Sequence, residues 1–379
     1  MGLGIYKGAR RVRIDMADVL MTGGGTGGHL FPALAVASAL QRLRPGCNVA
    51  FVGTPDRLEA QVVPEAGFPF FAIPARGLSR QPLQALAALG VLCVAIVRAW
   101  RLLRQEAPRA VFGTGGYVSA PLMLAACAQG IPCLLHEQNV YPGKVNQALA
   151  RFVTRFATSF ASSRTHLRTT EAWVSGNPVR TEAFEREPAA MRDVFGFASD
   201  ARVLLVTGGS QGAATINQAL LKLLPRILEQ TDWVVHHVCG LRQFDLIRRQ
   251  TSGIDASRYR LDGFLSDMPA AIIAADLVVS RAGATTLAEL TVAGKPMVLV
   301  PYPLAGGHQA LNAQEMRHAD AACVIPDAEL EAGALETHLW PLLADADRRA
   351  NMAEASRRLA RPEAAEALAT QLLVWLDGG

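Results

Sequence analysis

Five glycines and one threonine stand directly before a histidine near the start of the chain, in the segment TGGGTGGHLFPALAVASAL that begins at Thr22. The hydrophobic residues before this segment predict a strand, and the pattern over residues 31–43 predicts a helix. A glycine-rich turn between a strand and a helix lets the backbone approach a phosphate closely. The helix N-terminus adds unpaired N–H groups and the positive end of its dipole. The segment therefore predicts a site for a phosphate-bearing ligand, with His29 beside it.

Two more glycine clusters, at residues 113–116 and 208–212, also follow predicted strands. Three such loops at equivalent strand ends are better explained by substrates that carry several phosphates than by three tight turns. The first loop matches the dinucleotide pattern G-x-G-x-x-G, but the first acidic residue near the end of the second predicted strand is Asp56, which disfavours NAD. No GxxxxGK[ST] motif occurs, so a P-loop is excluded.

The elements that must position these loops can be predicted from the hydrophobic pattern. In the first half, helices alternate with strands at ADVLMT, NVAFVG, FPFFAIP, RAVFGTGG and IPCLLHEQ. The pattern restarts with ARVLLVTGGSQGAATINQALLKLL and continues through WVVHHVCG, DLVVS, ATTLAELTVAG and PMVLVPYP. This alternation predicts an α/β protein with two doubly wound, Rossmann-like domains and a boundary near residues 176–180. Ligands bind such sheets at the carboxyl ends of the strands, so two facing domains form a cleft.

The composition supports two domains and an anionic partner. The chain has 379 residues, and half of them are hydrophobic. Residues 1–180 hold 19 Lys and Arg against 8 Asp and Glu, whereas the remainder holds 18 against 25. This asymmetry indicates that the first half meets lipid head groups, phosphates or nucleic acid, with solvated arginines as the alternative. The six scattered cysteines disfavour a zinc site or a disulfide framework.

The lack of a recognisable signal peptide or transmembrane segment predicts a cytoplasmic protein. The basic N-terminus is not followed by the long apolar region of a signal peptide. The longest apolar run covers residues 83–97 and falls short of the roughly 20 residues that a transmembrane helix needs.

Several motifs, in their order along the chain, resemble one family closely. They are GGGTGGHLFPALAVA, GTGGYVSAP, HEQN, GNPVR, TGGSQGA, SRAGATTLAEL and GKPMVLVPYPLAGGHQALNA. The chain resembles the MurG family, the bacterial N-acetylglucosaminyltransferases of peptidoglycan synthesis, from about residue 18 to about residue 374. The resemblance implies a GT-B fold with a basic tail at 1–17 and an acceptor and membrane-facing domain at 18–179. A helix at about 361–379 completes that domain, and residues 180–360 form the UDP-GlcNAc-binding domain.

The resemblance also implies the reaction. The family transfers GlcNAc from UDP-GlcNAc to the 4-hydroxyl of MurNAc-pentapeptide on undecaprenyl diphosphate, which converts lipid I into lipid II with inversion at the anomeric carbon. Such a displacement needs a base for the acceptor hydroxyl, charge stabilisation for the leaving UDP, and positioning. No cofactor and no metal are expected, because a helix N-terminus can stabilise the diphosphate.

Donor contacts are implied for residues from both halves of the chain. They are Thr26, Gly27, Gly28, Asn139, Arg180, Ser210, Leu265, Met268, Ala284, Thr285, Glu289 and Gln309. The backbone at Ala284 and Thr285 would donate to the diphosphate, and the carboxylate of Glu289 would accept from both ribose hydroxyls. Leu265, through its backbone, and Met268 would frame the uracil.

The other donor contacts have less specific roles. Gln309 would bind the GlcNAc hydroxyls, and Ser210 lies near the diphosphate. Arg180 and Asn139 would reach the donor from the hinge and from the first domain.

The first two glycine loops face the acceptor and would hold its diphosphate by backbone donors. The acceptor residues implied by the resemblance are Gly25, His29, Gly115, Gly116 and Tyr117. His29 is one candidate for the catalytic base, because a helix N-terminus favours its neutral imidazole. Glu137 is the rival base, at the end of a strand that faces the same cleft, and the resemblance does not choose between them.

The family context implies a peripheral protein on the cytoplasmic face of the bacterial inner membrane. Arg98, Arg101 and Arg104, with Arg80 and Trp100, flank the apolar run and would contact an anionic membrane surface. Other cell-wall and division proteins are candidate partners. Nucleic acid is not expected, because the basic residues lack interleaved aromatic residues.

Other functions remain open at this stage. A diacylglycerol glycosyltransferase and a UDP-sugar epimerase share the expected fold, and a non-enzymatic nucleotide-sugar-binding module is a third alternative. The acceptor-side motifs favour lipid I over diacylglycerol, and a membrane-facing patch favours a transferase over an epimerase. The DAD sequence at Asp345–Asp347 resembles the DxD motif of metal-dependent transferases, but we interpret it as solvated surface of a helix rich in arginine and alanine.

Overall fold

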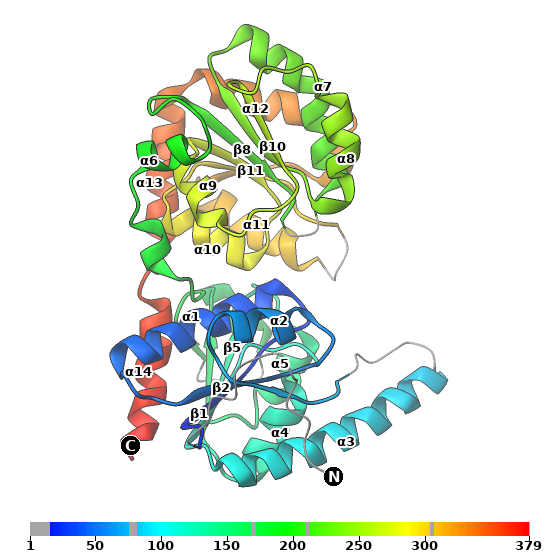
Figure 1. Ribbon diagram of the computed structural model, residues 1–379, viewed down its shortest axis with the longest axis vertical. Helices are drawn as coiled ribbons and strands as arrows, with labels where there is room; N and C mark the ends of the chain where they lie inside the picture. Colours follow the sequence, from blue (N-terminus) through cyan, green and yellow to red (C-terminus); the bar gives the residue numbers. More distant parts are fainter. Residues whose placement is uncertain (1–15, 76–81, 168–171, 210–211, 304–306, 379) are drawn as a thin grey trace. The chain divides into compact units, whose positions relative to one another are not determined.

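The computed structural model describes residues 16–75, 82–167, 172–209, 212–303 and 307–378. The chain divides into two compact units, shown in Figure 1. Unit 1 comprises Met1–Val179 and Glu363–Gly379, and unit 2 comprises Arg180–Pro362. Each unit is built around one parallel sheet, so the predicted pair of Rossmann-like domains is confirmed.

The described part of unit 1 contains a seven-stranded parallel sheet in the order β3-β2-β1-β4-β5-β6-β7. Its strands are β1 (Val19–Thr22), β2 (Val49–Gly53), β3 (Phe70–Ala72), β4 (Ala110–Gly113), β5 (Cys133–Glu137), β6 (Arg155–Thr158) and β7 (Ala172–Val174). Its helices are α1 (Gly27–Leu43), α2 (Leu58–Glu65), α3 (Pro82–Glu106), α4 (Ala120–Ala128), α5 (Lys144–Leu149), the 3₁₀ helix η1 (Ala161–His166) and α14 (Ala364–Leu376).

Both faces of this sheet are covered, because its strands alternate between two cores. Val19 and Met21 of β1 pack with α1 and α14 on one face, whereas Leu20 packs with α3 and α4 on the other. Figure 1 shows α14 beside α1, although the two helices lie more than 300 residues apart in the sequence. Ion pairs from Arg42 to Glu366 and from Arg44 to Asp377 join the same two helices at 2.5 and 2.7 Å.

The described residues of unit 2 likewise form a six-stranded parallel sheet, in the order β10-β9-β8-β11-β12-β13. Its strands are β8 (Val203–Thr207), β9 (Val234–Val238), β10 (Tyr259–Asp262), β11 (Leu277–Ser280), β12 (Met297–Leu299) and β13 (Ala322–Val324). Its helices are η2 (Thr181–Phe184), α6 (Pro188–Val194), α7 (Ala214–Gln230), α8 (Leu241–Gln250), α9 (Met268–Ala274), α10 (Ala284–Val292), α11 (His308–His318), η3 (Asp327–Glu329), α12 (Ala334–Ala344) and α13 (Ala346–Leu359).

The order of each sheet decides where a ligand can bind. In unit 1, β2 and β4 lie on opposite sides of β1, and in unit 2, β9 and β11 lie on opposite sides of β8. The chain direction across the sheet therefore reverses at β1 and at β8. The carboxyl ends of the strands at such a switch point are the usual binding place in open α/β sheets. The first and third glycine loops follow β1 and β8 directly.

Candidate active site

The glycines of the first loop are required in part by the protein's own side chains. A Cβ atom on Gly23 would lie 1.9 Å from Oγ1 of Thr114, and one on Gly24 would lie 2.5 Å from Cδ of Glu59. The backbone of Gly25 has a φ of +83°, which disfavours other residues. The density of glycines is thus explained by packing within unit 1 as well as by any ligand.

The amide of Gly25 is already engaged. Its N–H donates to Oε2 of Glu59 at 3.1 Å. Thr26 is the N-cap residue of α1, and Gly27 and Gly28 form its first turn. The loop thus leads directly into the N-terminus of α1, and helix N-termini are places where anions bind.

His29 is held in one tautomer by two oxygen atoms. Its Nδ1 lies 2.9 Å from the carbonyl oxygen of Thr114 and 2.8 Å from Oε1 of Gln138. Both partners are acceptors, so Nδ1 carries a proton, and in the neutral imidazole the lone pair is therefore on Nε2. The amide nitrogen of Gln138 lies 3.0 Å from Nδ1 of His136, whose Nε2 donates to the carbonyl of Gly176 at 2.9 Å. Burial lowers the pKa of His136 to about 4, so this second imidazole is neutral.

The second glycine loop lies against the same imidazole. A Cβ on Gly116 would lie 3.3 Å from Cδ2 and 3.6 Å from Nε2 of His29. The φ values of Gly115 and Gly116 are +93° and +79°. The ring of Tyr117 lies 3.5 Å from the Cβ position of Gly25. The structure thus brings the five predicted acceptor residues together at the carboxyl end of β1 and β4.

Glu137 has a different environment from His29. It is 1 % exposed, and its two oxygens accept from the backbone and side chain of Asn139, the amide of Gly143 and the side chain of Asn146, at 2.8–3.2 Å. These four hydrogen bonds hold the loop after β5 and the start of α5. Among the described residues, Nε2 of His29 has no such partner, so the geometry favours His29 as the group that can accept a proton.

The N-terminus of α10 forms the centre of the candidate donor site in unit 2. Gly283 is the N-cap residue, and Ala284 and Thr285 begin the helix, as expected for a diphosphate site. Glu289 follows in the next turn of the same helix. Burial raises the pKa of Glu289 to about 7, and the positive charge of Arg180 opposes this rise. The charge of Arg180 therefore acts on Glu289, and both are predicted donor residues.

Gln309 has one end of its side chain occupied. Its Oε1 accepts from the backbone N–H of Ala282 at 3.2 Å and of Tyr302 at 2.9 Å. The amide nitrogen is consequently the end that can donate to a sugar hydroxyl. Gln309 also joins the loops after β11 and β12, so it shapes the site as well as lining it.

The remaining predicted donor residues are spread over both units. Leu265 lies in the loop after β10, and Met268 is the first residue of α9. Asp267 caps that helix by accepting from Ala270 N at 3.2 Å. Asn139 belongs to unit 1, where its Nδ2 donates to Glu137 at 3.2 Å. Ser210 lies outside the described residues.

Two residues with clear structural roles were not predicted from the sequence. Arg281 forms an ion pair with Asp327 and donates to Thr215 Oγ1 and the Val300 carbonyl, both at 3.1 Å. The side chains of this pair are 12 % and 14 % exposed. They tie the ends of β11 and β12 to α7, next to the start of α10. The other residue is Glu59, whose role depends on its contact with Gly25, 34 residues away, and no sequence motif reveals such a contact.

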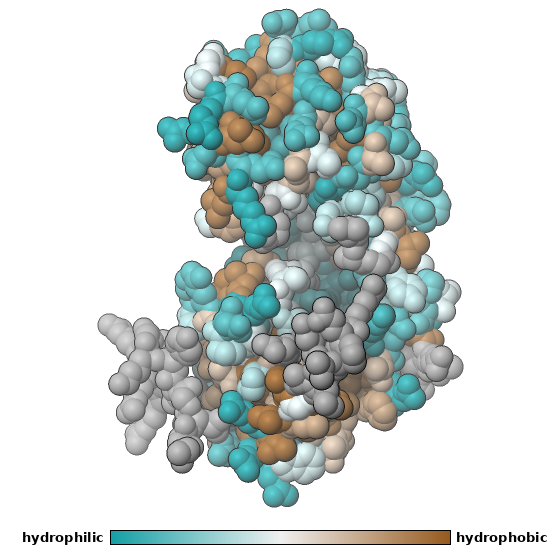
Figure 2. All heavy atoms as spheres, turned by 90° about the vertical axis from the view of Figure 1, so that its right-hand side faces the viewer, coloured by the Kyte–Doolittle hydropathy of each residue, from teal (hydrophilic) through white to brown (hydrophobic). Residues whose placement is uncertain are grey.

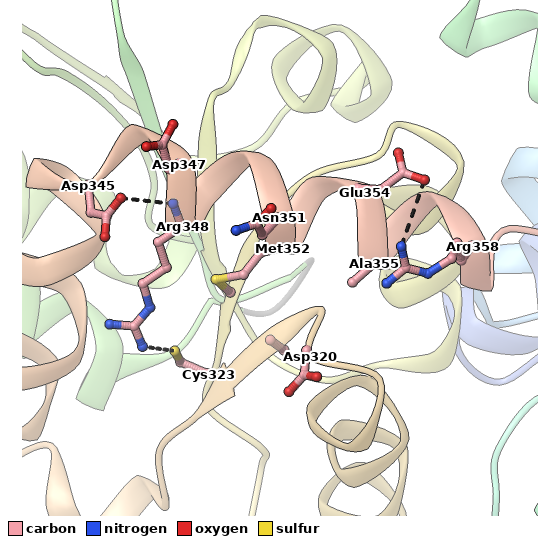
Figure 3. Close-up of a pocket in the computed structure, with 11 residues that line it drawn as sticks. Asp320, Cys323, Asp345, Asp347, Arg348, Asn351, Met352, Glu354, Ala355 and Arg358 are labelled. Carbon is pink, nitrogen blue, oxygen red and sulfur yellow. Dashed lines mark hydrogen bonds and ion pairs between the residues drawn. The ribbon is translucent and has the colours of Figure 1, made fainter.

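The DAD segment has a structural role at the start of α13. Asp345 is the N-cap residue of this helix and accepts from Arg348 N at 2.8 Å, as Figure 3 shows. Figure 3 also shows Asp320, Cys323 and Arg358 around the same hollow, whose volume is about 630 Å³. Across the part of the chain that the structure describes, no group of three or more acidic, His or Cys side chains could hold a metal ion.

Comparisons with known proteins agree with this geometry. The models of the glycosyltransferase family 28 N-terminal and C-terminal domains match residues 19–158 and 203–368. A Salinibacter ruber protein named UDP-N-acetylglucosamine–N-acetylmuramyl-(pentapeptide) pyrophosphoryl-undecaprenol N-acetylglucosamine transferase is 44 % identical over 362 residues, covering 95 % of this chain and 97 % of the relative. The crystal structure of Acinetobacter baumannii MurG matches with a TM-score of 0.73 and 30 % identity, over 94 % of this chain and 99 % of that one.

A protein from another enzyme class shares the fold alone. The structure of a putative UDP-N-acetylglucosamine 2-epimerase from Listeria monocytogenes has a TM-score of 0.69 at 17 % identity, covering 96 % of this chain and 98 % of its own.

Proposed function

Because this chain belongs to the MurG family of glycosyltransferases, we propose that it transfers GlcNAc from UDP-GlcNAc to the MurNAc 4-hydroxyl of lipid I and so forms lipid II for peptidoglycan synthesis. The observation that carries the proposal is the state of His29. Its Nδ1–H is held by the Thr114 carbonyl and by Gln138, and its Nε2 lone pair lies beside the second glycine loop. A neutral imidazole in this tautomer is suited to general-base catalysis.

The proposed reaction is a single displacement. Nε2 of His29 takes the proton of the acceptor hydroxyl while that oxygen attacks the anomeric carbon of GlcNAc. The bond from this carbon to the UDP oxygen breaks, and the configuration inverts. The N-terminus of α10, at Ala284 and Thr285, stabilises the charge on the leaving diphosphate. The carboxylate of Glu289 accepts from the ribose hydroxyls, and the amide nitrogen of Gln309 donates to the sugar.

The test is transfer of radiolabelled GlcNAc to a lipid I analogue, with and without EDTA, for wild type and for His29→Ala. Labelled lipid II that forms in EDTA, with kcat reduced at least a hundredfold in His29→Ala and with unchanged UDP-GlcNAc affinity, is the expected result. Consumption of UDP-GlcNAc without transfer would instead indicate an epimerase. Dependence on magnesium would contradict the metal-free reaction.

We also propose that unit 1 binds the cytoplasmic face of the bacterial plasma membrane through α3, where the lipid of the acceptor remains in the bilayer. No helix within the described residues is long and apolar enough to span a membrane. Leu89, Val94 and Val97 of α3 are 49–50 % exposed. Figure 2 looks at the right-hand side of Figure 1, and hydrophobic side chains reach the surface of unit 1 around this helix.

Three exposed arginines, Arg98, Arg101 and Arg104, follow the apolar part of α3. Each basic residue near an anionic leaflet contributes about 1 kcal/mol, so their loss should reduce vesicle binding about a hundredfold. The triple Arg→Glu variant should therefore fail to pellet with vesicles of phosphatidylglycerol. The control replaces three exposed arginines of α8, Arg242, Arg248 and Arg249, and should pellet like wild type. If the two variants pellet with vesicles to the same extent, membrane binding through α3 is refuted.

A further inference from the structure

We propose that Glu59 is the positioning residue of the first glycine loop, an inference that rests on the function proposed above. Its side chain is 1 % exposed and lies in the first turn of α2. One carboxylate oxygen accepts from the N–H of Gly25 at 3.1 Å. The other accepts from the N–H of Thr54 at 3.2 Å and from its hydroxyl at 2.6 Å. Glu59 therefore joins the loop after β1 to the end of β2.

Two glycines leave the space that this carboxylate fills. A Cβ on Gly24 would lie 2.5 Å from Cδ of Glu59, and one on Gly53 would lie 2.6 Å from its Cγ. These glycines belong to different segments, the first loop and the last position of β2. Neither has a positive φ, so neighbouring side chains, and not the backbone conformation, require glycine. At Gly24 the side chain is that of Glu59, and at Gly53 the ring of Phe70, 2.9 Å from the Cβ position, adds to it.

The position of the loop determines the walls of the acceptor site. Gly25, which the carboxylate holds, packs against the ring of Tyr117 at 3.5 Å from its Cβ position. The carbonyl oxygen of Gly24 lies 3.4 Å from the Cβ position of Gly116, and that position is 3.3 Å from Cδ2 of His29. A shift of the loop would therefore move both the tyrosine and the glycine that flank the proposed base. Small displacements at such places reduce rates strongly.

A carboxylate is required at this position because all three of its partners donate. In a Glu59→Gln variant, the amide nitrogen would point a donor at the N–H of either Gly25 or Thr54, which loses a hydrogen bond and opposes two donors. The negative charge also makes the loop around Gly25 a poor place for a diphosphate.

Glu59→Gln tests the proposal, with Glu65→Gln as the matched control. Glu65 is an exposed carboxylate on the same helix, and it accepts from Gln61 at 3.0 Å. We expect Glu59→Gln to lower kcat/KM for a lipid I analogue at least tenfold while the Kd for UDP-GlcNAc stays within twofold of wild type. The imidazole NMR signals of His29 should shift in the same variant. Glu65→Gln should match wild type in all three measurements.

The proposal is overturned if Glu59→Gln keeps kcat/KM within twofold of wild type and leaves the His29 signals in place. An equal loss of donor affinity and of acceptor kinetics would indicate that the variant has lost its fold, and the second variant then decides the proposal. Thr54→Val serves if Glu59→Gln does not fold, since it removes the 2.6 Å hydrogen bond and keeps the carboxylate. It should reduce kcat/KM for lipid I in the same direction, and an unchanged value would refute the proposal. If wild type makes no lipid II, the proposed function fails, and the His29 signals still report on Glu59.

Discussion

Binding of UDP-GlcNAc should strengthen as the pH rises through 7, because the carboxyl group of Glu289 has a pKa of about 7 in the free protein. Only about one-tenth of the molecules carry the carboxylate at pH 6, and about nine-tenths carry it at pH 8. If the charged form is the one that accepts from the ribose hydroxyls, the Kd should fall about tenfold between these pH values. Above pH 8 the Kd should be constant.

Isothermal titration calorimetry with UDP-GlcNAc measures this directly. UDP itself is unsuitable, because its terminal phosphate titrates with a pKa of about 6 and would add a second pH dependence. Glu289→Gln supplies the control, since an amide still accepts from a hydroxyl but does not titrate. We expect this variant to bind about tenfold more weakly than wild type at pH 8, with no dependence on pH. A wild-type Kd that is the same at pH 6 and pH 8 would refute the reasoning.

The same pKa predicts that the free energy of unfolding falls as the pH rises, whereas donor binding strengthens. The folded protein holds the Glu289 proton more tightly than the unfolded chain, since the pKa rises from 4.5 to about 7. The resulting stabilisation is fully present below pH 4.5 and is lost as the pH rises through 7, a difference of about 3 kcal/mol. Glu289→Gln should therefore increase the free energy of unfolding at pH 8 by up to about 3 kcal/mol while it weakens donor binding. Urea denaturation of wild type and Glu289→Gln at pH 5 and pH 8 checks the sign, because the histidines contribute equally to both proteins.

Three further outcomes are expected. Burial holds the pKa of His136 at about 4 and of His237 at about 3, so the unfolded chain binds these protons at a higher pH than the folded protein does. Urea denaturation should therefore show that the free energy of unfolding falls by about 2 kcal/mol for each histidine between pH 6.5 and pH 5, and a value that does not change with pH would contradict this. Gln138→Leu removes one acceptor from Nδ1 of His29 and should lower kcat about tenfold with donor affinity unchanged, whereas an unchanged kcat would show that the Thr114 carbonyl suffices. Arg281→Met leaves the Asp327 carboxylate without its ion pair and should reduce the free energy of unfolding by about 3 kcal/mol, and a loss under 1 kcal/mol would contradict the role assigned to this pair.

The hydrophobic pattern predicted the strands that carry long apolar runs. The segments ADVLMT, NVAFVG, IPCLLHEQ and DLVVS correspond to β1, β2, β5 and β11. Some short strands were not predicted, as with β6 at Arg155–Thr158, next to the edge of its sheet, and the edge strand β13 at Ala322–Val324. Such strands are recognised only by their neighbours in the sheet, so local periodicity is insufficient. The helix expected from residue 31 begins at Gly27, because glycines that discourage a helix in isolation are tolerated in its first turn.

The site was predictable where a motif is local and was not where contacts are distant. The glycine loops and His29 are close together in the sequence or in recurring motifs, and the structure gathers them. The tautomer of His29 depends on Thr114 and Gln138, which lie 85 and 109 residues away. Glu59 is similar, since its contact with Gly25 requires β1 and β2 to be neighbours. The spacing of residues in the sequence does not show which distant residues are in contact until the order of the strands in the sheet is known.

The return of α14 to unit 1 has a consequence for synthesis on the ribosome. Ala365, Leu368, Leu372 and Leu376 belong to the same buried core as the apolar face of α1. Unit 2 lies wholly between the two segments of unit 1 in the chain. The helix α14 is therefore synthesised after all of unit 2. Unit 2 can fold while the apolar face of α1 is still exposed. A released chain truncated near residue 362 should thus hold a finished second unit and an unfinished first one, which chaperones would recognise by its uncovered α1.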